Sequence, residues 1–264
     1  MLELANEVNV MELDNLRVDQ IILDKKLDDY DKMVVVIWDE LVILRSNFFI
    51  IEKIVKFPFS TFGLNDSNSS SFWSNVFVAL FENCINKIWN LVYDKPEKYL
   101  TLITLREAIR ERLIKEEFKE TFNEEISSIK FESKIEDIKK KINGLRHNII
   151  SHLQPKFNLN RGVSYNEFAV NLSEFEQIIL TADNLFQVLC FHSKGTLLVD
   201  FLRSQNGVNY SDVEGIFDSV VKNSDVYKMP DEQPDFWPSY RESLSRTDIE
   251  IINKYRKKFG DSEV

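Results

Sequence analysis

The stretch SKIEDIKKKINGLRHNIISHLQP, residues 133–155, indicates which kind of fold this chain of 264 residues adopts. It opens on a capping box, Ser133 followed by Glu136, and it closes at Pro155, as is typical of one α-helix. On a helical wheel one arc of this segment is apolar and holds Ile142, Leu145, Ile149, Ile150 and Leu153. The sequence therefore predicts an amphipathic helix over 133–154 that packs against other helices.

Further capping boxes extend this helical interpretation to most of the chain. They are Thr104 with Glu107, Ser173 with Glu176, Ser211 with Glu214, and Thr247 with Glu250. Together with the apolar spacing they predict helices at 10–31, 33–56, 71–93, 104–121, 133–154, 173–203, 212–222 and 247–259. The segment 72–93 is apolar on nearly every face, so we expect it in the middle of a bundle.

The composition favours the same fold class and excludes others. Only 7 glycines and 6 prolines are present, too few to supply the frequent turns that a β-sandwich or barrel requires. The short apolar run Val34–Ile37 would suit a strand, but its flanks continue at helical spacing. We therefore expect an all-α protein.

The spacing of glycine and cysteine excludes several kinds of site. No two glycines are close enough for a phosphate-binding loop or a dinucleotide fingerprint, and Cys84 and Cys190 have no second cysteine at metal-binding spacing. We expect no cofactor and no metal. The amino terminus lacks a signal pattern, and the longest apolar run, Met33–Trp38, is too short to span a membrane. The sequence predicts a soluble, cytoplasmic protein without a membrane partner.

Charge is unevenly distributed along the chain. The net charge is −10, yet residues 130–161 carry eight basic and three acidic side chains, a local net of +5. Such an island on an acidic protein fits a phosphate-binding cleft. A solvated helix face is the alternative explanation.

The composition changes after residue 203, so we expect a bundle domain at 1–203 and a C-terminal helical and proline/aromatic extension at 204–264. Residues 234–240 could dock a partner protein or pack as a strap on their own domain. The basic run that ends the chain's last helix is explained by the helix dipole, with Gly260 as the stop.

Chemistry concentrates in the string LRHNIISH, residues 145–152. Arg146 lies inside the apolar arc, and because burying an unpaired guanidinium is costly, it must meet an acid, a second subunit or an anionic ligand. His152 borders the same arc and has a side chain that exchanges protons near neutral pH. A buried salt bridge from Arg146 to Glu82 or Glu107 is the structural alternative.

Arg146 and His152 lie about 120° apart on the wheel, so one straight helix does not aim both at the same atom. A two-fold dimer could bring both pairs around one cleft. His152 could then move a proton at a ribose 2′-hydroxyl while Arg146 holds the phosphate. Asn148 and Ser151, on the polar side of the wheel, are candidate accessory residues.

The string from Arg146 to His152 resembles the Arg, four to six residues, His motif of the HEPN superfamily, with His147 as the polar residue that commonly follows the arginine. Residues 90–96, NLVYDKP, followed by 99–102, YLTL, are similar to the Asp-containing turn of abortive-infection-type HEPN proteins. The resemblance covers roughly residues 30–203.

This resemblance implies an up-and-down helical bundle that forms a homodimer with the motif helices facing each other. It further implies a metal-independent endoribonuclease that cuts single-stranded or loop RNA, as a toxin or antiviral effector with a possible cognate antitoxin or regulatory protein. Arg146 and His152 would be the catalytic pair and His147 an accessory residue. The alternatives are a catalytically inactive nucleotide- or protein-binding module, and a helical interaction protein with a structural Arg146.

Overall fold

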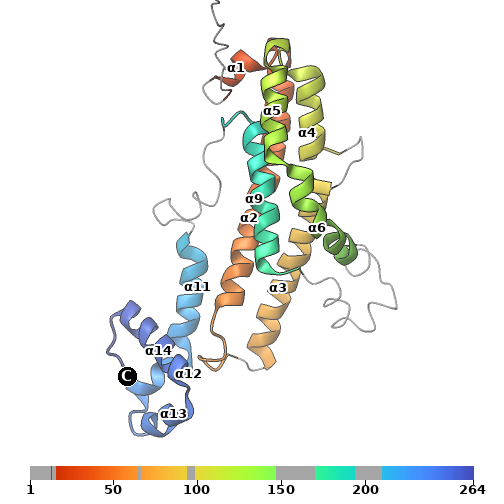
Figure 1. Cartoon of the computed structure of the whole chain (residues 1–264). Helices are drawn as coiled ribbons and strands as arrows, with labels where there is room; N and C mark the ends of the chain where they lie inside the picture. The colour runs from red at the N-terminus through yellow and green to blue at the C-terminus, as the bar shows by residue number, and fades with distance from the viewer. Residues whose placement is uncertain (1–12, 14–15, 65–66, 94–98, 147–169, 194–209) are drawn as a thin grey trace, which may run out of the picture. The chain divides into compact units, whose positions relative to one another are not determined.

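The computed structural model describes residues 13, 16–64, 67–93, 99–146, 170–193 and 210–264 (Figure 1). These residues form α-helices and no β-strand, and an isolated antiparallel bridge joins Ile22 to Ile114. The predicted all-α class is confirmed. In the described chain no helix is both long and apolar enough to cross a membrane. The chain divides into two compact units: unit 1 is Met1–Asn47 with Glu82–Leu198, and unit 2 is Phe48–Phe81 with Val199–Val264.

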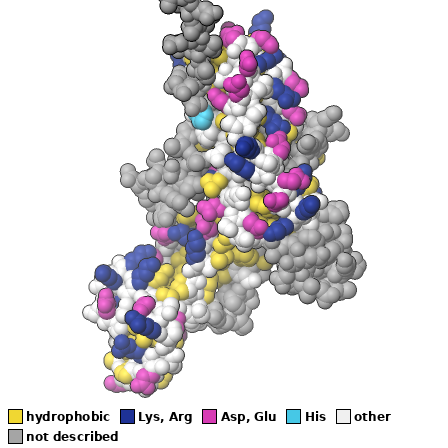
Figure 2. Space-filling model, in the orientation of Figure 1, with side chains coloured by type: hydrophobic (Ala, Val, Ile, Leu, Met, Phe, Trp, Pro, Cys, Tyr) yellow, Lys and Arg dark blue, Asp and Glu magenta, His cyan; other side chains and the backbone are white. Residues whose placement is uncertain are grey.

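Unit 1 is built around helix α9. It contains α1 (Val18–Ile21), the first part of α2 (Leu27–Lys56), the end of α3 (Ser67–Ile88), α4 (Leu102–Ala108), α5 (Lys119–Ile129), α6 (Phe131–Gly144) and α9 (Leu172–Leu189). Helix α9 contacts α4, α5 and α6 and runs alongside α2 (Figure 1). Its apolar residues at helical spacing are fully buried: Ile178, Ala182, Leu185, Phe186 and Leu189. Acidic and basic side chains alternate over the helices of unit 1 on the face shown in Figure 2.

Two buried polar contacts join α2 to α9. The Tyr30 hydroxyl donates a hydrogen bond to the carbonyl oxygen of Leu189 at 3.0 Å. The Arg45 guanidinium forms an ion pair with the Asp183 carboxylate, and both side chains are only 7% exposed. Because a buried charge must be paired, these contacts allow only one register between the two helices.

Unit 2 has its own hydrophobic core. Its helices are the end of α2, the start of α3, α11 (Tyr210–Asn223), α12 (Asp225–Glu232), α13 (Trp237–Ser243) and α14 (Arg246–Phe259). The core is formed by Ile54, Phe57, Phe62, Phe217, Val221, Val226, Tyr227, Trp237 and Ile252. Since Trp237 is part of this core and Tyr240 packs against it, residues 234–240 pack on their own unit, as the strap interpretation expects.

The C-terminal residues of unit 2 are held by α14. Arg256 is 1% exposed and donates two hydrogen bonds to the Asp231 carboxylate, each at 2.9 Å, and one to the Tyr227 carbonyl at 3.2 Å. The paired carboxylate raises the pKa of Arg256 further above its ordinary value. Asn253 exchanges hydrogen bonds with the backbone of Val264 at 2.8 and 3.0 Å. Gly260 ends α14 at φ +86°, as predicted.

Some predicted helix limits are wrong. The segment expected as one helix over 104–121 breaks at Ile114, whose neighbours exchange backbone hydrogen bonds with the segment Ile21–Leu23 at 2.9 and 3.0 Å. Helix α5 follows this break and was not predicted. The helix expected at 33–56 is confirmed as part of α2, which begins earlier, at Leu27, and ends at Lys56. In the segment expected as a helix over 10–31, the described residues form the short helical turns Val18–Ile21 and Asp24–Lys26 before α2 begins. Val34–Ile37 are helical, as their flanks indicated.

The predicted capping residues are also wrong where the structure describes them, although the helices exist. The observed caps lie earlier in the chain: Thr101 accepts from the Thr104 amide at 3.1 Å, Asn171 from Glu174 at 2.8 Å, and Ser245 from Asp248 at 3.1 Å. None of these pairs fits the pattern of Ser or Thr followed three residues later by Glu. One has asparagine at the cap, and the other two have threonine or aspartate at the later position. Helix α6 instead follows Lys130 in the left-handed conformation.

The prediction for 72–93 is correct for one half of that segment. Cys84, Ile85 and Ile88 are fully buried in unit 1. In the other half, within unit 2, Phe72 is 59% exposed and Val78 40% exposed, so that part is not central in a bundle. The predicted domain boundary between residues 203 and 204 lies outside the described residues and stays a prediction.

Candidate functional site

Helix α6 carries Arg146 to its place in unit 1. The apolar residues of α6 and of the turn that follows are buried, namely Phe131, Ile135, Ile138, Ile142 and Leu145. After Gly144 the helix widens into a π-helical turn at Leu145 and Arg146. The residues Trp89–Tyr93, directly after α3, also form a π-helical turn, and α6 packs against it. Such wide turns often occur at functional sites because they redirect side chains.

The guanidinium of Arg146 lies over the indole of Trp89. Its central carbon is 5.1 Å from the centroid of the ring, within the range of a cation–π interaction. Arg146 is partly exposed, yet its Nε atom is buried and has no hydrogen-bond partner among the residues that the structure describes. Leaving a buried donor unsatisfied typically costs about 1–3 kcal/mol. The Nε of Arg45, whose guanidinium is ion-paired with Asp183, is likewise buried without a hydrogen bond in the described part of the chain, so this atom alone does not distinguish Arg146 from a structural arginine.

The structural alternative assigned Arg146 to a buried salt bridge with Glu82 or Glu107. Among the residues that the structure describes, neither of these carboxylates pairs with Arg146. Arg45, a buried arginine of the same unit, does have an acidic partner in Asp183. The aromatic face of Trp89 thus takes the place that a carboxylate occupies beside Arg45.

Neighbouring lysines of the basic stretch are already engaged. Lys141 pairs with Glu174 on α9 at 2.6 Å, and Lys139 with Glu136 on its own helix at 3.8 Å. The hydrogen bond from Lys141 is the main cause that lowers the pKa of Glu174 below its usual range. Part of the local positive charge is therefore neutralised. Arg146, in the turn after α6, instead lies against the aromatic ring of Trp89.

The remaining predicted site residues lie outside the described residues. These are His147, Asn148, Ser151 and His152, and the same holds for residues 94–96 of the similar turn. The joint role of Arg146 and His152 therefore stays a prediction. Within the described chain no group of three or more His, Cys, Asp or Glu side chains could hold a metal ion.

Sequence reasoning placed Trp89 in the core and assigned it no role at the site. Trp89 is 57 positions before Arg146, and no local pattern connects them. Only the packing of α6 against the turn after α3 brings the two side chains together. The similar turn at 90–96 lies directly after Trp89 and was the one local signal that pointed to this part of the chain.

Comparison with known proteins adds one match. Residues 27–215 match the HEPN_AbiU2 family model, described as AbiU2. The matched range includes Trp89 and the whole string from Arg146 to His152, and it ends within α11. No curated protein and no solved structure matches the chain.

Proposed function

The chain belongs to the AbiU2 family of HEPN proteins, an abortive-infection-associated family, and on this premise we propose that it is a metal-independent endoribonuclease acting through Arg146 and His152. The observation that carries the proposal is the state of Arg146. Its guanidinium lies over Trp89 and, among the residues that the structure describes, it has no acidic partner such as Arg45 has in Asp183, as expected of a side chain that receives an anionic ligand.

The proposed reaction divides the work between two side chains. His152 removes the proton from a ribose 2′-hydroxyl, and the 2′-oxygen attacks the adjacent phosphorus. The bond from phosphorus to the 5′-oxygen breaks, and that oxygen receives a proton from the protonated imidazole of His152, which leaves a 2′,3′-cyclic phosphate on one fragment and returns the histidine to its neutral form. Arg146 holds the phosphate and stabilises the charge that develops on its oxygens. Two copies of the chain would place two such pairs around one cleft.

The test is cleavage of single-stranded and loop-containing RNA by the full purified chain in EDTA, with the new ends sequenced. We expect 2′,3′-cyclic phosphate ends, and we expect that His152→Ala and Arg146→Ala abolish cleavage. Two matched controls should cleave normally: His192→Asn changes the one histidine outside the 145–152 string, and Arg246→Ala removes an arginine whose side chain is 94% exposed. Unchanged cleavage by His152→Ala would contradict the catalytic assignment.

The same samples separate the proposal from its alternatives. A chain that cuts no RNA but is stabilised by a nucleotide only when Arg146 is present would be a non-catalytic binding module. The mass in solution tests the composite cleft, because a strict monomer at micromolar concentration would contradict it. Expression of wild type beside His152→Ala, with growth measured in both cultures, tests the proposed role as a toxin or antiviral effector.

A further inference from the structure

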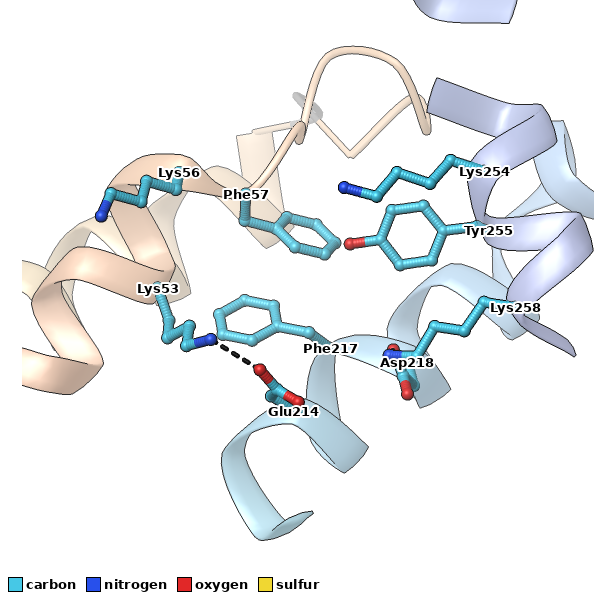
Figure 3. Close-up of a pocket in the computed structure, with 9 residues that line it drawn as sticks. All are labelled: Lys53, Lys56, Phe57, Glu214, Phe217, Asp218, Lys254, Tyr255 and Lys258. Carbon is cyan, nitrogen blue, oxygen red and sulfur yellow. Dashed lines mark hydrogen bonds and ion pairs between the residues drawn. The ribbon is translucent and has the colours of Figure 1, made fainter. Parts of the chain in front are cut away.

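Unit 2 contains a cavity of about 440 Å³ that the proposed RNA cleavage does not use (Figure 3). Its lining comes from the end of α2, from α11 and from α14: Lys53, Lys56, Phe57, Glu214, Phe217, Asp218, Lys254, Tyr255 and Lys258. All of these residues belong to one compact unit. The volume lies within the range of about 300–1,000 Å³ that is usual for small-molecule sites.

The inner surface of this cavity is aromatic. The rings of Phe57 and Phe217 stack with their centroids 4.5 Å apart, and both side chains are buried in the core of unit 2. Tyr255 lies opposite, with its hydroxyl directed toward Phe57 (Figure 3). Burial, and to a smaller degree the nearby carboxylates of Asp218 and Glu214, raise the pKa of Tyr255, so its phenol stays neutral and can donate a hydrogen bond.

The rim of the cavity is basic. It carries four lysines against two acids, on a protein whose net charge is −10. Lys53 pairs with Glu214 at 2.6 Å and Lys258 with Asp218 at 2.7 Å, so both acids of the lining are engaged. Figure 2 shows basic side chains gathered on the surface of the C-terminal helices.

Lys254 differs from Lys53 and Lys258 because neither acid of the lining pairs with it. Among the described residues no carboxylate lies at ion-pair distance from it, and Figure 3 shows its side chain extending toward the space beside Phe57. Lys56 is 67% exposed and pairs only with Glu52, one turn earlier on its own helix and outside the lining. The Lys254 ammonium is therefore the one available to a bound anion, whereas that of Lys56 is directed away from the space beside Phe57 (Figure 3).

The basic residues at the end of α14 therefore have two roles, one in the core and one at the cavity, which the helix dipole alone does not explain. Arg256 points into the core and binds Asp231. Lys254, Tyr255 and Lys258 lie on another face, because residues three and four apart share a side of a helix, and this face forms one wall of the cavity. The tail of the chain thus contributes an aromatic group and two cations to the same space.

We propose that this cavity binds a nucleotide unit, with the base against the aromatic surface and the phosphate at Lys254. A flat aromatic group and an adjacent anion match this lining, and stacking on aromatic side chains combined with basic groups is how proteins hold single nucleotides of RNA. The nucleotide is either a free nucleoside phosphate or one unit of an RNA strand. The site shares no residue with Arg146 and Trp89.

The experiment uses the full chain carrying His152→Ala, so that RNA stays intact during the measurement. Binding is measured by calorimetry with each of the four nucleoside monophosphates, with a short single-stranded RNA, and with inorganic phosphate. Binding of a monophosphate identifies a site for free nucleotides, and binding of RNA without the monomers identifies a site for the strand. Either result supports the proposal. Absence of both, or inorganic phosphate binding as tightly as the nucleotides, would overturn it.

Variants of the last helix make the test specific. Lys254→Ala should weaken binding at least about tenfold, because a hydrogen bond from a charged donor is lost. Lys257→Ala is the matched control: it removes the same charge from the same helix, at an exposed residue outside the lining, and should leave affinity within about twofold. Equal weakening by both variants would mean general electrostatic attraction and would refute the site. Cleavage is assayed separately with an intact His152, so failure of the proposed ribonuclease and of this site are distinguishable.

Discussion

Two arginines of unit 1 offer a direct test of whether Arg146 is a structural or a functional residue. Arg45 is paired with Asp183, and both side chains are 7% exposed. Replacing Arg45 with Met leaves a buried carboxylate without a partner, which typically costs about 3–5 kcal/mol of folding free energy. We expect a loss of that size for Arg45→Met, largely recovered in the double variant Arg45→Met, Asp183→Leu, because the buried charge is then absent.

Arg146→Met should behave differently. Its described contact is the cation–π interaction with Trp89, worth about 0.5–2 kcal/mol. Against this loss, the substitution removes a buried Nε donor that has no partner within the described part of the chain, a relief of about 1–3 kcal/mol. The two contributions oppose each other, so we expect the free energy of unfolding to fall by no more than about 1 kcal/mol, with cleavage abolished.

Denaturant unfolding measures both variants under the same conditions. The transitions are followed by far-ultraviolet circular dichroism and by tryptophan fluorescence, and coincident curves with unchanged slope are required before free energies are compared. Arg45→Met serves as the positive control for a structural arginine. A loss of about 3–5 kcal/mol in Arg146→Met as well would show that Arg146 has a buried acidic partner and would refute the reasoning.

Further predictions concern the support of the site and of the helix ends. Trp89→Leu should lower cleavage at least about tenfold and Trp89→Phe much less, because only an aromatic face orients the guanidinium; equal effects on cleavage would contradict this. The lowered pKa of Glu174 means that its pairing with Lys141 stabilises the folded chain above the carboxyl group's ordinary pKa, and that this contribution is lost as the pH falls through the lower folded value. Lys141→Ala should therefore reduce stability by about 0.5–1 kcal/mol at pH 7 and by less near pH 3, measured by urea unfolding at both pH values. Gly260→Ala should cost about 1–2 kcal/mol in thermal unfolding, since φ is +86° although nothing obstructs the added carbon, and Gly260→Asn should cost less.

The sequence by itself determined the fold class and the segment in which function is sought. Helices with their own caps and periodic apolar faces, such as α14 with its stop at Gly260, are recognisable because those signals are local. The same holds for the string from Arg146 to His152, whose composition stands out in the sequence. Helix starts were found while the capping residues were missed, because several neighbouring residues could each cap the same turn.

Only the tertiary structure decided which distant residues meet. The break at Ile114 depends on backbone pairing with Ile22, some ninety positions earlier, which no local propensity encodes. Likewise Trp89 reaches Arg146, and Lys254 reaches the space beside Phe57, only after helices far apart in the chain have packed. The periodicity of a helix predicts which of its faces is buried. Which other helix packs against that face depends on how all helices of the bundle bury their apolar surfaces together.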